Sequence, residues 1–218
     1  AEHQTAGRGR NGRAWAAAPG ASLTFSLGLP YAPADWAGLS LAVGATLAHA
    51  IEPQPARLQL KWPNDLWLAD GPGCWRKLGG ILIETVPLPG GERGCVVGIG
   101  LNVRPRGDVA GLASGYACVQ ELEPALEAPA LLARVAAPLL VALARFEREG
   151  FAPFAAAFAA RDLLRGRAVG TTLTECPDGI ADGVDATGAL RLRHAAGVAL
   201  LNSGEVSVRP QPEPVEPG

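Results

Sequence analysis

Hydrophobic positions along the chain follow two periods, which predict strands and helices in turn. Apolar residues at every second position over 23–29 predict a half-buried strand. Apolar residues at helical spacing over 36–51 predict a helix, which Pro53 ends. A stronger helical pattern over 132–146 predicts a long helix that stops at Gly150.

Between these two helices the chain is expected to be mostly extended. Residues 58–61 indicate a short strand that enters the turn Trp-Pro-Asn-Asp, and residues 66–68 continue extended after it. Two almost continuously apolar runs, 79–86 and 95–103, predict buried strands that pair as a hairpin. Residues 104–118 have several glycines and no clear period, so we expect a mobile loop there.

The pattern changes after Arg165. Ahead of it, an Ala-rich helix is expected over 151–164. After it, short β-prone runs separated by glycine turns predict a small barrel over 166–210. The proline-rich residues 211–218 predict a disordered tail. The expected fold class is α/β (α+β), with a larger domain over 1–165 followed by the barrel.

Composition narrows the classes of function. The 218 residues are 48% hydrophobic and 18% charged, and their formal net charge is −2, so no DNA or membrane partner is expected. The longest apolar run, 135–144, is about half a membrane span. Four cysteines without paired spacing fit a reducing compartment, so a cytoplasmic location is expected. The chain lacks methionine altogether, and we therefore expect the beginning of the natural protein to be missing.

The first candidate ligand-binding segment is GRGRNGRAW, residues 7–15. Its three arginines can bind carboxylates or phosphates through two parallel hydrogen bonds, and its glycines let a ligand approach the backbone closely. The segment therefore suits a small anionic ligand. Taken alone, it fits a solvated basic loop or a contact with RNA equally well.

Lysine is rare here: of 19 basic residues only Lys61 and Lys77 are lysines. A lysine offers a compact point charge where arginine offers a planar fork, so these positions are candidates for chemistry, although chance explains two lysines as well. Lys61 begins KWPND, in which Asp65 can cap the turn or contact a ligand or metal. Lys77 precedes two glycines and a buried strand.

A further strand, GIGLNV (98–103), carries two glycines in its interior and an asparagine beside them. Glycine weakens a strand unless something must approach it closely, so a ligand is expected against this strand. The segment lacks the spacing of a P-loop or of a dinucleotide-binding fingerprint, and neither of those sites is predicted.

Together and in this order, HQTAGRGRNGRAW, KWPNDL, KLGGILIE, VVGIGLNV and the later GEVSVR resemble the biotin–protein ligase family over nearly the whole chain. The resemblance implies a class II synthetase-like catalytic domain over 1–165, with a mixed β-sheet flanked by helices and its N-terminal part missing. It also implies an SH3-like barrel over 166–210. Such an enzyme forms biotinyl-5′-AMP from biotin and ATP with Mg²⁺, and it transfers biotin to a lysine of a biotin carboxyl carrier protein domain.

The resemblance also implies roles for individual residues. It implies catalytic roles for Lys77, Arg8 and Arg10. It implies biotin contacts by Gln4, Gly7, Arg8, Gly9, Arg10, Lys77, Gly80, Gly98 and Gly100. It implies ATP contacts by Arg13, Trp15, Lys61, Asn64, Lys77, Asn102, Glu205 and Arg209. No residue is assigned to a metal.

The sequence departs from the family in two places. The family's Ser-Thr-Asn segment lies upstream of the first motif and falls outside this chain, and Asn11 stands where the family often has a basic residue. Three alternatives compete with this interpretation. The motifs disfavour a lipoate- or octanoate-transferring enzyme, and the net charge disfavours an RNA-binding module. A repressor with a helix-turn-helix domain upstream stays open, as does a homodimer.

Overall fold

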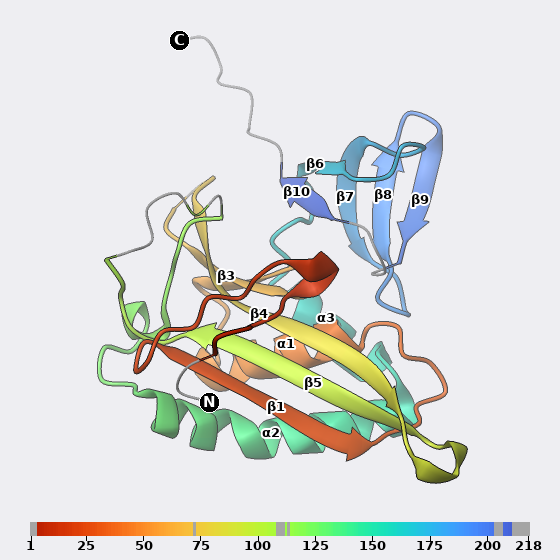
Figure 1. Ribbon diagram of the computed structural model, residues 1–218. Coiled ribbons are helices and arrows are strands. Elements are labelled where there is room, and N and C mark those ends of the chain that lie inside the picture. The colour runs from red at the N-terminus through yellow and green to blue at the C-terminus, as the bar shows by residue number, and fades with distance from the viewer. Residues whose placement is uncertain (1–3, 72, 108–111, 113, 203–206, 211–218) are drawn as a thin grey trace, which may run out of the picture.

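The computed structural model describes residues 4–71, 73–107, 112, 114–202 and 207–210. The expected tail over 211–218, Glu205 and part of the loop over 104–118 lie outside the described residues. The described chain forms two antiparallel sheets of five strands each, and its helices pack with the first sheet (Figure 1).

The first sheet has the strand order β1-β5-β4-β3-β2, and each neighbouring pair is antiparallel. The expected hairpin of two buried strands is confirmed as β4 and β5. Parallel pairing, expected of a mixed sheet, is limited among the described residues to one isolated bridge between Leu60 and Asp162. The strands are β1 (Ser22–Pro30), β2 (Leu58–Lys61), β3 (Asp65–Ala69), β4 (Trp75–Pro87) and β5 (Arg93–Asn102).

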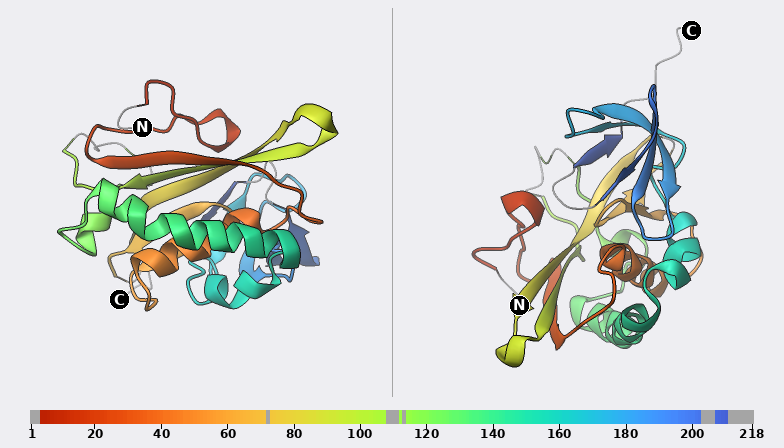
Figure 2. Two further views of the ribbon diagram at one scale, coloured as in Figure 1. Left: turned by 90° about the horizontal axis from the view of Figure 1, so that it is seen from below. Right: turned by 90° about the vertical axis from the view of Figure 1, so that its right-hand side faces the viewer.

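Two helices cover one face of this sheet, while the N-terminal loop crosses the opposite face (Figure 2). The predicted helices are present as α1 (Leu39–Ile51) and α2 (Ala128–Glu149). Length and composition alone would allow α2 to cross a membrane. Its buried side chains, which include Leu131, Leu139 and Phe146, pack into the core against α1 and β1, as in a helix of a globular core.

The Ala-rich helix expected over 151–164 was wrong in its length. The segment has only a 3-10 turn (Ala152–Phe154) and the short helix α3 (Ala155–Ala159). Beyond α3 the backbone pairs with β2 instead: Leu60 N–H donates to Arg161 O at 2.8 Å, and Leu163 N–H donates to Leu60 O at 3.0 Å. The buried Arg161 guanidinium also bonds Glu52, and these tertiary bonds override the helix propensity of alanine.

The second sheet has the order β10-β6-β7-β8-β9, and its closure into an SH3-like barrel stays a prediction. The turn between its strands β7 and β8 contacts the KWPND turn through the fully buried Trp62, whose Nε1–H donates to Gly188 O at 3.1 Å. Close to this bond, Gly188 meets Gly38 so tightly that a Cβ on Gly188 would lie 2.7 Å from the Gly38 Cα atom. The strands are β6 (Ala168–Thr171), β7 (Asp178–Val184), β8 (Leu190–His194), β9 (Gly197–Leu201) and β10 (Val208–Pro210).

Replacing each of two adjacent leucines of α2 tests how much the packing of this helix contributes to stability. Leu139 is fully buried, whereas the side chain of Leu140 is 55% exposed. We expect Leu139→Ala to lower the free energy of unfolding by about 2–5 kcal/mol, because it removes buried methyl groups and leaves a cavity. The matched change Leu140→Ala should stay within about 0.5 kcal/mol. Urea denaturation measures both, and equal effects would contradict the packing of α2.

Candidate functional site

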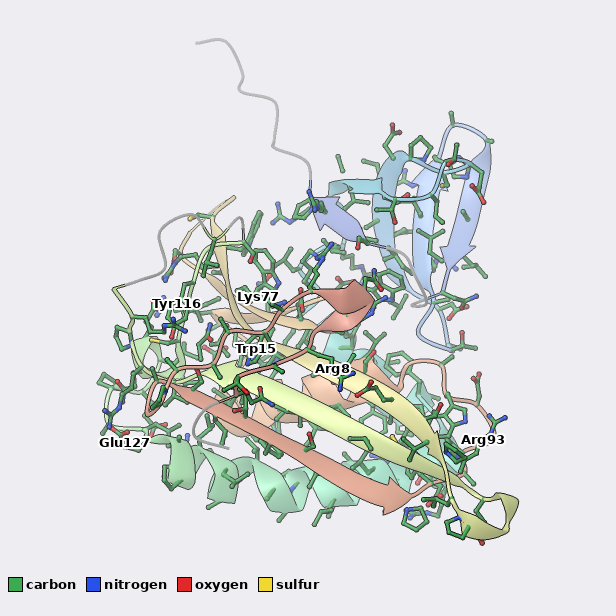
Figure 3. All side chains as sticks on the ribbon, in the orientation of Figure 1. Arg8, Trp15, Lys77, Arg93, Tyr116 and Glu127 are labelled. Atoms are coloured by element: carbon green, nitrogen blue, oxygen red, sulfur yellow. The ribbon has the colours of Figure 1, made fainter. Side chains whose placement is uncertain are left out.

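A cavity of about 980 Å³ opens on the sheet face opposite the helices. Its walls come from the N-terminal loop, β1, the central strands, Leu112, residues 114–116 and β10. Figure 3 shows Arg8, Trp15 and Lys77 gathered on this side of the sheet, whereas Arg93 lies at the far end of the β4–β5 hairpin. The cavity therefore joins segments from both ends of the chain.

The antiparallel register aligns four cavity-lining residues in one row across the sheet. Thr24 pairs with Gly100, Gly100 with Gly80, and Gly80 with Asp65. Successive residues of a strand point to opposite faces, so neighbours such as Leu23, Leu66 and Leu101 are buried in the core instead. The row gives the cavity a floor of bare backbone flanked by a hydroxyl and a carboxylate.

The register of β3 and β4 shifts by one residue beside this row. Gly79 pairs with Leu66 and Lys77 pairs with Trp67, which leaves Leu78 as an extra residue on β4. Such a bulge interrupts the regular alternation of faces. Lys77 consequently lines the cavity, while Leu78 stays fully buried in the core.

Lys77 and Asp65 form an ion pair within the cavity wall. Lys77 Nζ donates to Asp65 Oδ1 at 2.7 Å, and the two side chains are 27% and 17% exposed. Gly80 lies directly beside them, because a Cβ at that position would lie 3.5 Å from Lys77 Nζ. The ion pair fixes the ammonium group at the end of the glycine floor.

The other end of the glycine floor is covered by Trp15. A Cβ on Gly100 would lie 2.5 Å from Trp15 Cε2, so only glycine allows the indole ring to lie this close to the strand. Trp15 Nε1 is buried and has no hydrogen-bond partner among the described residues. An unpaired buried donor costs about 1–3 kcal/mol, so the site favours a ligand with an acceptor atom there.

Local backbone constraints shape the N-terminal loop. Gly7 O accepts from Trp15 N–H at 2.9 Å, and a Cβ on Gly7 would collide with the Trp15 carbonyl oxygen. Asn11, in the 3-10 turn Arg10–Gly12, has φ 55° and ψ 37°. Asparagine adopts this left-handed conformation more readily than most residues, which gives a physical reason for an asparagine at this position.

Arg10 reaches from this loop to the KWPND turn. Its guanidinium donates to Asn64 Oδ1 at 3.3 Å, and Asn64 Nδ2 donates to Ile81 O at 2.7 Å. Burial lowers the pKa of Arg10, and the nearby Asp65 carboxylate partly offsets that effect. The asparagine thereby links the arginine loop to β4 through its two amide atoms.

The pKa of Lys61, which lines the cavity, is strongly lowered. Burial is the main reason why its pKa falls from 10.5 to about 8. Asp65 raises the pKa, whereas the cations Lys77, Arg13 and Arg209 lower it further. A bound polyanion would supply the opposite charge that this amine lacks, so the cavity favours an anionic ligand.

Most of the site residues expected from the sequence line this one cavity. They are Gln4, Arg8, Gly9, Arg10, Arg13, Trp15, Lys61, Asn64, Lys77, Gly80, Gly98, Gly100, Asn102 and Arg209. Gly7 lies outside the lining and acts through the close approach of Trp15, and Glu205 is outside the described residues. Asn102 is buried and donates to Ala117 O at 3.0 Å and Lys77 O at 3.3 Å, which gives it a structural task as well.

Sequence reasoning left several lining residues unassigned. Asp65 was noted in KWPND without a role, and its pairing with Lys77 depends on the sheet register. Three other unassigned polar residues of the lining, Asn11, Glu84 and Ser207, lie within GRGRNGRAW, KLGGILIE and GEVSVR. The rest had no motif to indicate them: Thr24, Ser26, Arg106, Ser114 and Tyr116. No group of three His, Cys, Asp or Glu side chains placed to hold a metal occurs among the described residues.

Comparisons with known proteins agree with this architecture. The model of the Biotin/lipoate A/B protein ligase family matches residues 1–102. The biotin–[acetyl-CoA-carboxylase] ligase of Paracoccus denitrificans is 34% identical, covering 94% of this chain and 88% of that protein. The bifunctional ligase/repressor BirA of Escherichia coli is 36% identical and covers 96% of this chain, which spans 65% of the length of BirA.

A solved structure of the biotin protein ligase from Aquifex aeolicus in complex with biotin and ATP has a TM-score of 0.81 and 26% sequence identity to this chain. The match covers 96% of this chain and 87% of that one. The sheet, helices and cavity thus place the protein in the class of biotin and lipoate ligases. Within that class, the chain belongs to the biotin–protein ligase family.

The low pKa of Lys61 can be measured directly, because the chain has only two lysines. Lysine labelled with ¹³C at Cε should give two side-chain NMR signals, and Lys61→Gln removes and so assigns one of them. We expect that signal to titrate near pH 8. A midpoint near 10.5 would contradict the burial of the amine.

The lowered pKa of Lys61 also contributes to the pH dependence of the free energy of unfolding. Because the pKa of Lys61 falls on folding, the folded protein binds fewer protons than the unfolded chain between about pH 8 and 10.5. The contribution of Lys61 to the free energy of unfolding should therefore rise with pH in that window, and Lys61→Gln should remove this rise in urea denaturation.

The contact between Trp15 and Gly100 gives a separate prediction. In Gly100→Ala the new methyl group would overlap the indole, so Trp15 must move. Among the ¹H–¹⁵N indole signals of the five tryptophans, that of Trp15, assigned with Trp15→Phe, should shift most. Gly28→Ala, on the neighbouring strand with open space around it, is the control. An unchanged Trp15 signal in Gly100→Ala would contradict the contact.

Proposed function

We propose that this protein is a biotin–[biotin carboxyl carrier protein] ligase. It would form biotinyl-5′-AMP from biotin and ATP, and then transfer biotin to one lysine of a carrier domain of a carboxylase. The observation that carries the proposal is the placement of Lys77, paired with Asp65 at the end of a glycine floor. The names of the relatives, and the biotin and ATP in the Aquifex aeolicus structure, support the choice of substrates.

The charges of the cavity suit two anionic substrates. Among the described residues, seven cations line it (Arg8, Arg10, Arg13, Lys61, Lys77, Arg106 and Arg209), against two carboxylates, Asp65 and Glu84. A carboxylate and a polyphosphate repel each other, so a reaction between them needs fixed cations around both. The excess of positive charge would offset that repulsion and stabilise the charge that develops on phosphorus.

The chemistry consists of two displacements. In the first, a carboxylate oxygen of biotin attacks the α-phosphorus of ATP, and pyrophosphate leaves with the electrons of the broken P–O bond. In the second, the neutral lysine amine of the acceptor attacks the carbonyl carbon of biotinyl-5′-AMP, loses a proton, and expels AMP. Lys77, Arg8 and Arg10 would hold the reacting carboxylate and phosphate, and none of these three residues is consumed.

The two expected binding regions are contiguous. Trp15, expected to contact the nucleotide, packs on Gly100, which is expected to form the floor for biotin. Lys77, expected to touch both substrates, lies at the opposite end of the same register row, against Asp65. This arrangement would bring the biotin carboxylate and the α-phosphate together without a large movement of the sheet.

We also propose that Mg²⁺ binds in the cavity together with the phosphates of ATP. Mg²⁺ is usually held by one or two carboxylates together with substrate phosphates, and does not require an all-protein cage. Among the described residues, Asp65 and Glu84 are the carboxylates of the cavity lining, so we propose that they hold it. When bound, the ion would neutralise phosphate charge during the first displacement.

The reaction would take place in the cytoplasm. This chain would contact neither a membrane nor DNA. β1 is an edge strand of the first sheet, and its free edge would allow a homodimer by extension of that sheet. Sedimentation velocity over a range of concentrations tests that assembly.

Replacement of Lys77 is the central test. We expect Lys77→Ala to lower kcat/KM for pyrophosphate release by about 10²–10³-fold, because a preorganised cation at the reacting phosphate is lost. Biotin transfer to a purified carrier domain, followed by intact mass, should fall in parallel. Arg93→Ala removes an exposed cation at the far hairpin end and should change neither rate (Figure 3). Transfer of lipoate in place of biotin by the unaltered protein would overturn the choice of substrate.

A further inference from the structure

We propose that Arg76 is a positioning residue that couples the backbone of Lys77 to residues 114–117 at the cavity rim. The inference deepens the proposed function and rests on it for its kinetic consequences. Arg76 precedes Lys77 on β4 and is absent from the cavity lining, so it would act through other groups and without touching a substrate.

The Arg76 guanidinium is held on three sides. Its Nε donates to Asp70 Oδ2, and its Nη1 and Nη2 donate to the two carboxylate oxygens of Glu121 at 3.1 and 2.6 Å. Nη1 also donates to the backbone carbonyl of Tyr116 at 2.6 Å. A planar fork can bind a carboxylate and a carbonyl at once, whereas lysine cannot reproduce this geometry.

Arg76 also packs against the rim segment. Gly115 has φ +61°, and a Cβ there would lie 2.8 Å from the Arg76 Cγ atom. The stem of Arg76 thus lies against one residue of the segment while its fork holds the carbonyl of the next. Ser114, Gly115 and Tyr116 all line the cavity, and Figure 3 shows Tyr116 close to Lys77.

The same rim segment pairs with the backbone of Lys77. Lys77 N–H donates to Ser114 O at 3.0 Å, and Ala117 N–H donates to Lys77 O at 2.9 Å. The buried Asn102 amide bonds both Lys77 O and Ala117 O. Lys77 lies before Gly79, the first residue of β4 that pairs with β5, so on that side its backbone is supported by residues 114–117 instead.

Glu121 links Arg76 to the backbone of Cys118, which follows the rim segment 114–117. Its Oε1 accepts the Cys118 N–H at 3.0 Å while the same carboxylate holds Arg76. Burial alone would raise the pKa of Glu121, but the bonds from Arg76 and Cys118 more than offset it, so the net pKa is lowered. The carboxylate therefore stays charged at neutral pH and keeps the rim anchored to β4.

Arg134 offers a matched control. It binds Glu123 with the same two-pronged geometry, at 2.6 and 2.9 Å, and its side chain is 34% exposed against 31% for Arg76. No residue of this pair lines the cavity. Arg134→Gln removes a comparable surface ion pair without touching the rim, and it measures the general cost of such a loss.

The first experiment is hydrogen exchange on the protein alone, resolved to single amides by NMR. In Arg76→Gln we expect the amides of Lys77 and Ala117 to exchange at least about tenfold faster, with the Ile99 amide in the sheet centre unchanged. Arg134→Gln should leave all three unchanged. Equal protection of Lys77 and Ala117 in Arg76→Gln and the unaltered protein would overturn the coupling, whether or not the chain is a ligase.

The second experiment measures pyrophosphate release with biotin and ATP. Arg76→Gln and Glu121→Gln should each lower kcat/KM by about 10-fold or more, and the double variant should be no worse than either, because both break one network. Arg76→Lys should recover only part of the rate. Additive losses, or a loss equal to that of Arg134→Gln, would overturn the positioning role. An inactive unaltered protein would refute the proposed function and leave the exchange result standing.

Discussion

The bulge in β4 determines which face of the sheet receives Lys77. With Leu78 as an extra residue in the core, the lysine lines the cavity and meets Asp65 across the strand pair. A strand of regular alternation would have turned its odd-numbered residues towards the helices, as it does at Ile81. The glycine floor begins beside this ammonium, and the rim at residues 114–117 bonds the backbone of the same lysine.

An excess of cations is costly to assemble without anions, and the structure limits that cost in distinct ways. Lys77 has Asp65 as a partner, and Arg10 bonds a neutral amide. Burial lowers the pKa of Lys61 to about 8, so this ammonium gives up its proton more readily than an ordinary lysine. The site thus holds most of its positive charge in fixed positions before any ligand arrives, which is the condition for effective electrostatic stabilisation of a phosphoryl reaction.

The cavity is built by segments that are distant in sequence, so its geometry depends on how they dock. The N-terminal loop reaches Ser207, the residue before β10, through a hydrogen bond from Arg13 to Ser207 Oγ at 3.4 Å. Trp62 joins the KWPND turn to the second sheet, and Arg76 joins β4 to the rim. Loss of any of these contacts would change the surroundings of Lys77 without altering the reacting groups themselves.

The sequence by itself determined the regular elements and the motif residues, because these depend on local periodicity and residue chemistry. The strands of the first sheet, α1, α2 and the glycine-rich lining were all expected from it. Tertiary contacts decided the rest. The bond partners of Arg161 shortened α3, the register gave Asp65 its partner, and the bulge turned Lys77. Each of these depends on which distant backbone groups pair, and no local pattern encodes that choice.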